Sequence, residues 1–216
     1  MVSSNGSNTE GVTMKAVEGP FGLRFIEIDA TEIYIGTNKG AWVYASERPR
    51  HRVSLPSFLI LESPITRKQY AEIIGENDDS DEIKDMITND EIAHVCSSLQ
   101  DHFDEEVRRP TQSEWKAAES EIKLPCGWTE LLADEATGNH RGASLDGRPR
   151  TGEMIGPMSG HRVSQSAHPT KEGIFAQVTT PGNRPLPKVG FRLVVSPKRY
   201  GEVPKVPDNA NLSSNI

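Results

Sequence analysis

The chain has 216 residues, a length that suits one domain with a sizeable core and is short for two. Its net charge is −7 and it has no basic stripe interleaved with aromatic residues, so nucleic acid is not an expected partner. The N-terminus lacks the pattern of a signal peptide, and no run of about 18 apolar residues predicts a membrane span. With two cysteines and no disulfide framework, we expect a cytoplasmic protein with reduced thiols.

The predicted elements begin with a flexible polar arm at residues 1–18. Residues 22–28 alternate between apolar and polar side chains, which predicts a strand, and residues 32–36 are its expected hairpin partner. Two further strands are predicted at residues 52–55 and 58–61, on either side of Pro56.

Three helices are predicted by one shared signature, a threonine cap followed three residues later by Glu or Gln. The three caps are Thr66, Thr88 and Thr111. The first helix should end at Gly75. The second carries an amphipathic stripe that includes Cys96, and the third should run to about Ile122.

Residues 124–177 show little periodicity, and strands are expected there near residues 162–165 and 174–179. Residues 189–195 form the last predicted strand, and residues 199–216 are expected to be a flexible tail. Short strands, few helices and a long irregular connection are typical of an α+β domain.

Four motifs, in order along the chain, resemble those of the formylglycine-generating-enzyme, or sulfatase-modifying-factor, domain family. Residues 47–55 resemble its E-x-P-x-H-x-V-x-L strand, and residues 58–71 resemble its F-x-I…P-V-T-x-x-Q-Y segment. Residues 109–119 resemble its R-L-P-T-x-x-E-W-x-x-A-A signature, and residues 190–194 its closing G-F-R-L-V strand. The matching residues that we expect to be structural are His51, Pro64, Thr66, Arg109, Thr111, Glu114, Trp115, Gly190, Phe191 and Arg192.

The resemblance implies a loop-rich variant of the C-type lectin fold, with a small twisted antiparallel sheet and two to three helices. It implies a domain at residues 19–198. Catalysis in the family uses copper held by two neighbouring cysteine thiolates, and thiolates suit Cu(I). No cysteine follows Cys126 here, and Cys96 lies 30 residues earlier on the apolar stripe, so this copper pair is absent.

We therefore predict a non-catalytic domain of this type that acts as a binding or accessory module. Loops on a rigid scaffold usually carry recognition, so the expected surface for a protein or small-molecule ligand is the face built from residues 124–188. The residues predicted to line it are Trp128, His140, Arg148, Arg150, His161, Arg162, His168 and Arg184.

Two alternatives stay open. The first is a metal-dependent oxidase related to the family with an altered metal site, since the three histidines of that face have side chains that can hold iron or zinc. The second is a structural subunit of a larger assembly. No cofactor is expected apart from a structural calcium ion, for which the acidic segments lack the usual loop spacing.

Overall fold

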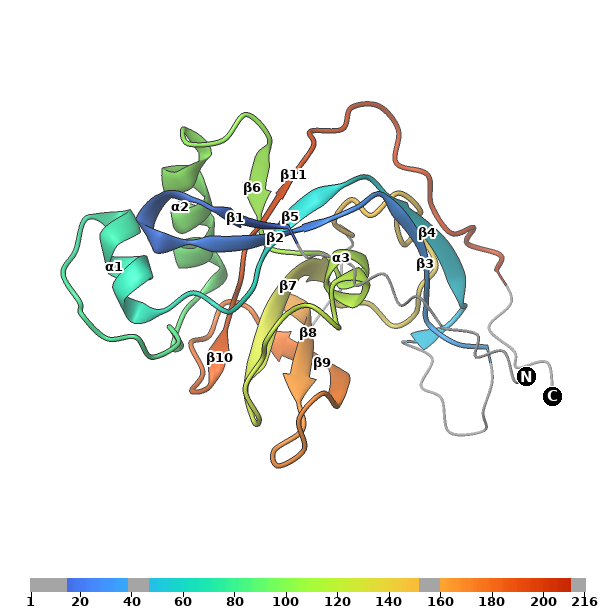
Figure 1. The fold of residues 1–216 in the computed structure, drawn as a ribbon. Helices are drawn as coiled ribbons and strands as arrows, with labels where there is room; N and C mark the ends of the chain where they lie inside the picture. The colour runs from blue at the N-terminus through green and yellow to red at the C-terminus, as the bar shows by residue number, and fades with distance from the viewer. Residues whose placement is uncertain (1–14, 39–46, 152–159, 211–216) are drawn as a thin grey trace, which may run out of the picture.

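The computed structural model describes residues 15–38, 47–151 and 160–210 (Figure 1). Within these ranges the chain is α+β and rich in loops, which confirms the predicted class. In chain order the elements are β1 (Ala16–Glu18), the 3-10 turn η1 (Pro20–Gly22), β2 (Arg24–Ile28), β3 (Thr31–Ile35), β4 (His51–Leu55), β5 (Phe58–Leu61), α1 (Arg67–Ile74), α2 (Asn89–Gln100), β6 (Glu106–Arg108), α3 (Gln112–Ala117), β7 (Thr129–Glu135), β8 (His161–Ala167), β9 (Phe175–Pro181), β10 (Val189–Gly190) and β11 (Val194–Ser196). None of these helices has the length and apolar character needed to cross a membrane.

The strands form three sheets rather than the single small sheet that was expected. A five-stranded antiparallel sheet has the order β1-β2-β5-β11-β6, and a four-stranded sheet has the order β10-β7-β8-β9. In the second sheet β10 and β7 are parallel, while the other neighbours are antiparallel. Strands β3 and β4 form a separate antiparallel pair.

A long two-stranded ribbon connects the five-stranded sheet to the β3–β4 pair. Ile28 of β2 faces Phe58 of β5, and Thr31 of β3 faces Leu55 of β4, so one register continues through the break at Pro56. The predicted hairpin between residues 22–28 and 32–36 is therefore wrong. Strands β2 and β3 instead follow one another along the same side of the ribbon (Figure 1).

The three helix starts confirm the capping signature. Thr66, Thr88 and Thr111 each accept a hydrogen bond from the main chain three residues on, and the Gln or Glu there bonds back. Gly75 ends α1 in the left-handed conformation, with φ of 78°. Helix α3 is shorter than predicted: it ends at Ala117 and not near Ile122.

Two apolar cores lie on opposite faces of the five-stranded sheet. One lies between this sheet and helices α1 and α2, and it contains Phe25, Val95 and Phe191. The other contains Ile26 and Trp115, and it joins the sheet to α3, the β3–β4 pair and β7. Phe25 and Ile26 are neighbours in β2, so alternation along the strand supplies both cores.

The predicted strand at residues 189–195 is split between two sheets. β10 pairs with β7, and β11 pairs with β5 and β6. Arg192 lies between these short strands and is fully buried. Their partners β7 and β6 were not predicted as strands.

Arg192 is held by a network in which each of its guanidinium nitrogens donates a hydrogen bond. Nε donates to Glu130 Oε1 of β7 at 2.7 Å, Nη1 to the Leu61 carbonyl at 2.9 Å and Nη2 to the Lys123 carbonyl at 2.6 Å. The second oxygen of Glu130 accepts a hydrogen bond from the Trp115 indole at 2.8 Å. A buried ion pair is tolerated when its polar atoms are satisfied in this way.

Parts of the two expected flexible ends are built into the domain. Strand β1 pairs with β2 inside the predicted arm, whose residues 1–14 lie outside the described ranges. In the predicted tail, Val206 is buried and exchanges main-chain hydrogen bonds with Gly142 and Ala143, while residues 211–216 are not described. Both segments are held because their main-chain groups form hydrogen bonds with the segments beside them.

We expect Arg192→Met to lower the free energy of unfolding by about 3–5 kcal/mol, because it leaves the Glu130 carboxylate buried without its counter-charge. Urea unfolding followed by circular dichroism measures this loss. The control is Arg24→Met, which removes a 57% exposed arginine 3.4 Å from Glu62 and should cost below about 1 kcal/mol. Equal losses for the two variants would contradict the role given to Arg192.

Candidate functional site

The segment with the clearest family resemblance forms the corner at which α3 begins. Arg108, not Arg109, pairs with the fully buried Glu114, through two hydrogen bonds of 2.7 Å each. The arginine that the motif comparison singled out as structural was Arg109. Arg109 instead donates to Asn89 Oδ1 of α2 at 2.6 Å, and burial lowers its pKa to about 10.

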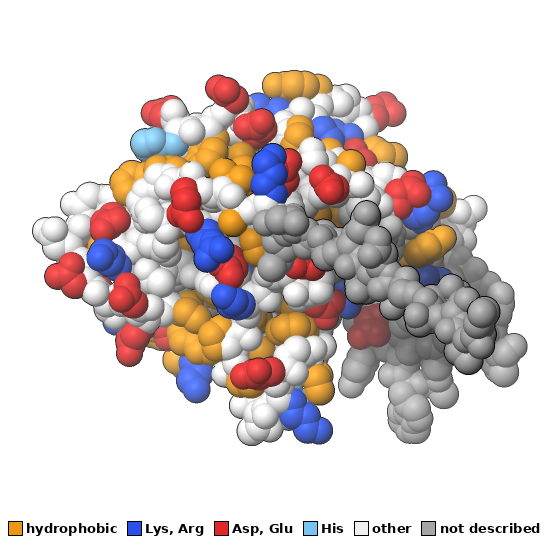
Figure 2. Space-filling model, in the orientation of Figure 1, with side chains coloured by type: hydrophobic (Ala, Val, Ile, Leu, Met, Phe, Trp, Pro, Cys, Tyr) orange, Lys and Arg blue, Asp and Glu red, His pale blue; other side chains and the backbone are white. Residues whose placement is uncertain are grey.

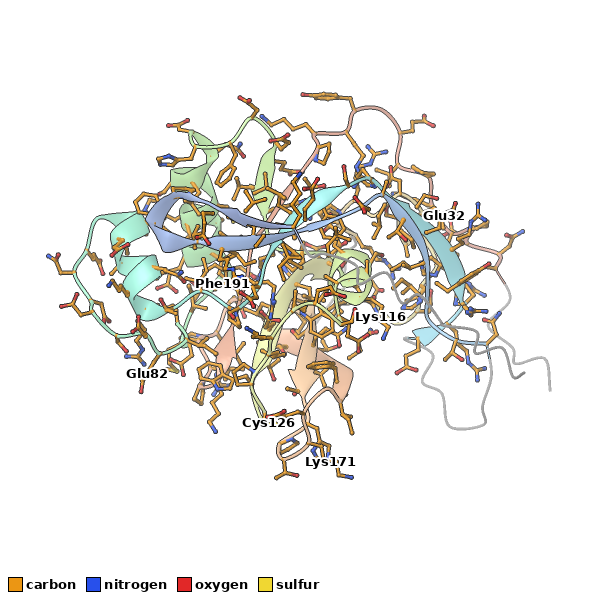
Figure 3. The ribbon with its side chains drawn as sticks, viewed as in Figure 1. Glu32, Glu82, Lys116, Cys126, Lys171 and Phe191 are labelled. Carbon is orange, nitrogen blue, oxygen red and sulfur yellow. The ribbon has the colours of Figure 1, made fainter. Side chains whose placement is uncertain are left out.

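A groove runs along α3, with the end of β3, the β8–β9 hairpin and the segment that leads into β7 as its other walls. It consists of two adjoining cavities of about 310 and 880 Å³ that share Lys116, Glu119 and Phe175. Cys126 lines the larger cavity, and Figure 3 shows it at the lower end of the segment that leads into β7. Volumes of this size are typical of ligand sites.

The chemistry of this α3 groove is mixed. Phe175 supplies an apolar surface, and its ring meets that of Trp115 edge to face at a centroid distance of 4.9 Å. Lys116 and Glu119 pair with each other on the α3 side, while Glu172 lies on the hairpin side. Such a surface suits a ligand that combines an apolar group with charged groups.

Helical spacing in the sequence could have indicated one wall of the groove. Gln112, Lys116 and Glu119 recur at i, i+4 and i+7 after the Thr111 cap, so they share one side of the helix and the turn that follows it. Trp115, at i+3, lines the same cavity, although its side chain is buried. The sequence interpretation began the binding face at residue 124 and missed these residues.

A second, smaller cavity adjoins the α3 groove at Gln112 and Gln177, whose side-chain amides are hydrogen-bonded to each other. Its volume is about 30 Å³, which is enough for one or two water molecules and not for a larger ligand. Three of the predicted ligand residues line it, namely His140, Arg148 and Arg150.

Two histidine rings lie together at this cavity. Nδ1 of His51 and Nδ1 of His140 lie 3.1 and 3.3 Å from the same acceptor, the Pro49 carbonyl oxygen. Both Nδ1 atoms therefore carry the proton, and each Nε2 has a free lone pair. Nε2 of His140 is buried and has no partner within the described residues.

The surroundings of His140 keep its ring neutral. Burial, then the neighbouring His51, lowers its pKa to about 4, and the Arg150 guanidinium acts in the same direction. Burial also lowers the pKa of His51. Asp134, which lines the same cavity, has a pKa raised by burial, although its carboxylate accepts hydrogen bonds from the main-chain N–H groups of Gln112 and Arg150.

The two arginines of the cavity are used by the fold. Arg148 binds Asp146 and donates to the carbonyls of Gly201 and Glu202, in the segment that follows β11. Arg150 donates to the main-chain carbonyls of Asn139 and Arg141. These guanidiniums hold loops in place rather than facing an open binding surface.

The other predicted ligand residues are scattered. Arg162 donates to the Ala133 carbonyl and lies 3.4 Å from Glu135. His161 begins β8 and has a buried Nδ1, and His168 accepts a hydrogen bond from Thr170 beyond the end of β8. Trp128 lies next to Gly190 and Arg184 is exposed. The structure therefore does not gather the eight residues into one site.

The two cysteines have different surroundings. Cys96 packs against the first core, and burial raises its pKa to about 11. Cys126 lines the α3 groove, far from α2 in the view of Figure 3. Within the described ranges no three His, Cys, Asp or Glu side chains are grouped closely enough to hold a metal ion.

The low pKa of His140 makes stability depend on pH. Because the unfolded chain binds a proton at the ordinary pKa of about 6.5, the free energy of unfolding should fall as pH drops from about 6.5 to 4, by up to about 3 kcal/mol. Urea unfolding across this range should show a smaller pH dependence in His140→Gln. The control is His94→Gln on the exposed face of α2, which should retain the slope of the unaltered protein. A slope that His140→Gln leaves unchanged would contradict this origin.

The fold is similar to those of known proteins, although the sequence is not. No protein-family model and no curated protein matches the sequence. Among solved structures, PvdO from Pseudomonas aeruginosa superposes with a TM-score of 0.62 and 12% identity, over 84% of this chain and 98% of that one. Treponema denticola variable protein 1 superposes with a TM-score of 0.59 and 16% identity, over 85% and 99%. Identities this low show a shared fold and nothing more. The shared fold agrees with the C-type-lectin-like fold that the motifs predict.

Proposed function

We propose that this protein is a binding or accessory module that receives a protein segment or a small molecule in the α3 groove. One observation carries the proposal, namely that the groove lies between α3 and the β8–β9 hairpin and is large enough for a ligand. The hairpin side and the segment that contains Cys126 belong to the predicted face of residues 124–188. Helix α3 adds the opposite wall.

The side chains of the groove favour a ligand with both apolar and charged parts. Phe175 offers a surface for an apolar group. Lys116 lies between the two cavities, since it lines both of them, and its ammonium group would attract a carboxylate. Because Glu119 and Glu172 are close to the same space, a cationic group on the ligand also has a partner.

Cys126 allows this proposal to be tested by disulfide tethering. A set of disulfide-bearing fragments, identical except for a terminal carboxylate or ammonium group, is equilibrated with the protein under mild reductant. The Cys126 thiolate attacks the fragment disulfide and releases the other half as a thiol, and the mixed disulfide is measured by intact mass. We expect carboxylate fragments with an aromatic ring to be retained preferentially, and Lys116→Glu to reduce that preference about tenfold, the effect of losing roughly 1.4 kcal/mol of interaction. Cys96 should remain unlabelled because its thiol is protonated at neutral pH.

Lys171→Glu is the matched control, because it makes the same charge change at the tip of the β8–β9 hairpin, outside the lining of the groove (Figure 3). It should leave fragment retention as it is in the unaltered protein. If carboxylate and ammonium fragments are retained equally, retention reflects only the reactivity of the Cys126 thiol. That outcome would reject the α3 groove as a binding site.

The competing proposal is an oxidase with an altered metal site. It requires ligands from Cys126 or from the histidines of the predicted face. We expect protein purified without chelator, and a second sample offered Cu(I), to hold copper, iron and zinc far below one ion per chain by elemental mass spectrometry. One ion per chain that is lost in His140→Ala, His161→Ala or Cys126→Ser would favour the oxidase instead.

A further inference from the structure

Strand β9 is an unusual sheet edge. It has seven residues, Phe175–Pro181, and it pairs along its whole length with β8 in one uninterrupted register. No other strand of the described chain pairs with its second side. Main-chain N–H and C=O groups on that side are therefore available to another strand.

The devices that usually protect a sheet edge are weak here. Protected edges are short, charged, bulged or covered. The edge strands β1 and β6 have three residues each and contain Glu18, Glu106 and Arg108, and β10 has two residues. Strand β9 has no charged residue and no bulge, and only Pro181 at its end disfavours pairing.

Apolar side chains are exposed along the same edge. Val178 is 37% exposed, and Ile174, directly before the strand, is 49% exposed. Ala176 and Thr179 are exposed as well. In Figure 2 hydrophobic side chains are visible at the surface in the lower part of the view, where Figure 1 draws β8 and β9, together with charged side chains of both signs.

We propose that β9 is a self-association site, at which the β9 strands of two copies pair antiparallel and join their four-stranded sheets. A second copy is the occupant that the composition favours, because an uncharged strand can face itself about a two-fold axis without placing like charges opposite each other. With the axis at Val178, this residue faces its own copy. Gln177 then faces Thr179 of the second copy, and Ala176 faces Thr180.

The size of this contact sets the expected strength. A pair of seven-residue strands buries less than the roughly 800 Å² per partner of a standard stable interface. The dimer should therefore be weak, with a dissociation constant on the order of 10–100 µM, and it should dissociate on dilution. This inference does not rest on the α3 groove or on its ligand.

Sedimentation velocity of the full chain from about 5 to about 500 µM tests the proposal across that range. We expect a shift from monomer to dimer mass for the unaltered protein. Val178→Lys places a charge opposite its own copy, and Ala176→Lys places a charge opposite Thr180 of the second copy. Each should raise the dissociation constant at least about tenfold. Both positions are exposed, so the variants should fold, and circular dichroism checks this.

Met86→Lys is the matched control, because Met86 is a 49% exposed hydrophobic residue outside β9. It should dimerise as the unaltered protein does. A monomer at every concentration would overturn the proposal, and so would a dimer that both β9 variants leave intact. Binding of an extended peptide to β9 of a protein that stays monomeric would also overturn it, because the occupant would then be a different partner.

Discussion

The buried ion pair between Arg192 and Glu130 is the contact on which the arrangement of the domain depends. Arg192 lies where the chain passes from the four-stranded to the five-stranded sheet, and Glu130 lies on β7. The guanidinium also holds the carbonyls of Leu61 and Lys123, and the carboxylate holds the Trp115 indole. One buried cluster therefore joins two sheets, α3 and the segment that leads into β7.

This cluster explains how a short helix can form a wall of the candidate site. Helix α3 has six residues, which is too short for a helix to be stable by itself. Its buried side is fixed at two adjacent positions, where Glu114 binds Arg108 and Trp115 binds Glu130. Lys116, the next residue, is thereby oriented toward the groove. The recognition surface that we propose is thus placed by the same polar contacts that close the core.

The sequence was a better guide to structural residues than to ligand residues. Eight long polar or aromatic side chains in an irregular segment suggested a binding pocket, yet the guanidiniums of Arg148 and Arg150 are taken up by main-chain carbonyls. Loops without regular hydrogen bonds leave many carbonyls to satisfy, and arginine can satisfy several at once. Composition does not distinguish this role from ligand binding, whereas the partners of each nitrogen do.

What the sequence by itself determined is local: the three helix starts, the stop at Gly75, the α+β class and the order of the family-like motifs. The helix starts and the stop depend on residues within about four positions of the main-chain groups that they satisfy. The tertiary structure alone decided that β3 pairs with β4, that residues 189–195 are divided between two sheets, that Arg108 rather than Arg109 binds Glu114, and that α3 faces the β8–β9 hairpin across a groove. Those outcomes depend on which distant segments pack together, and strand β7, buried along most of its length, carries no alternating pattern that would show its partner in advance.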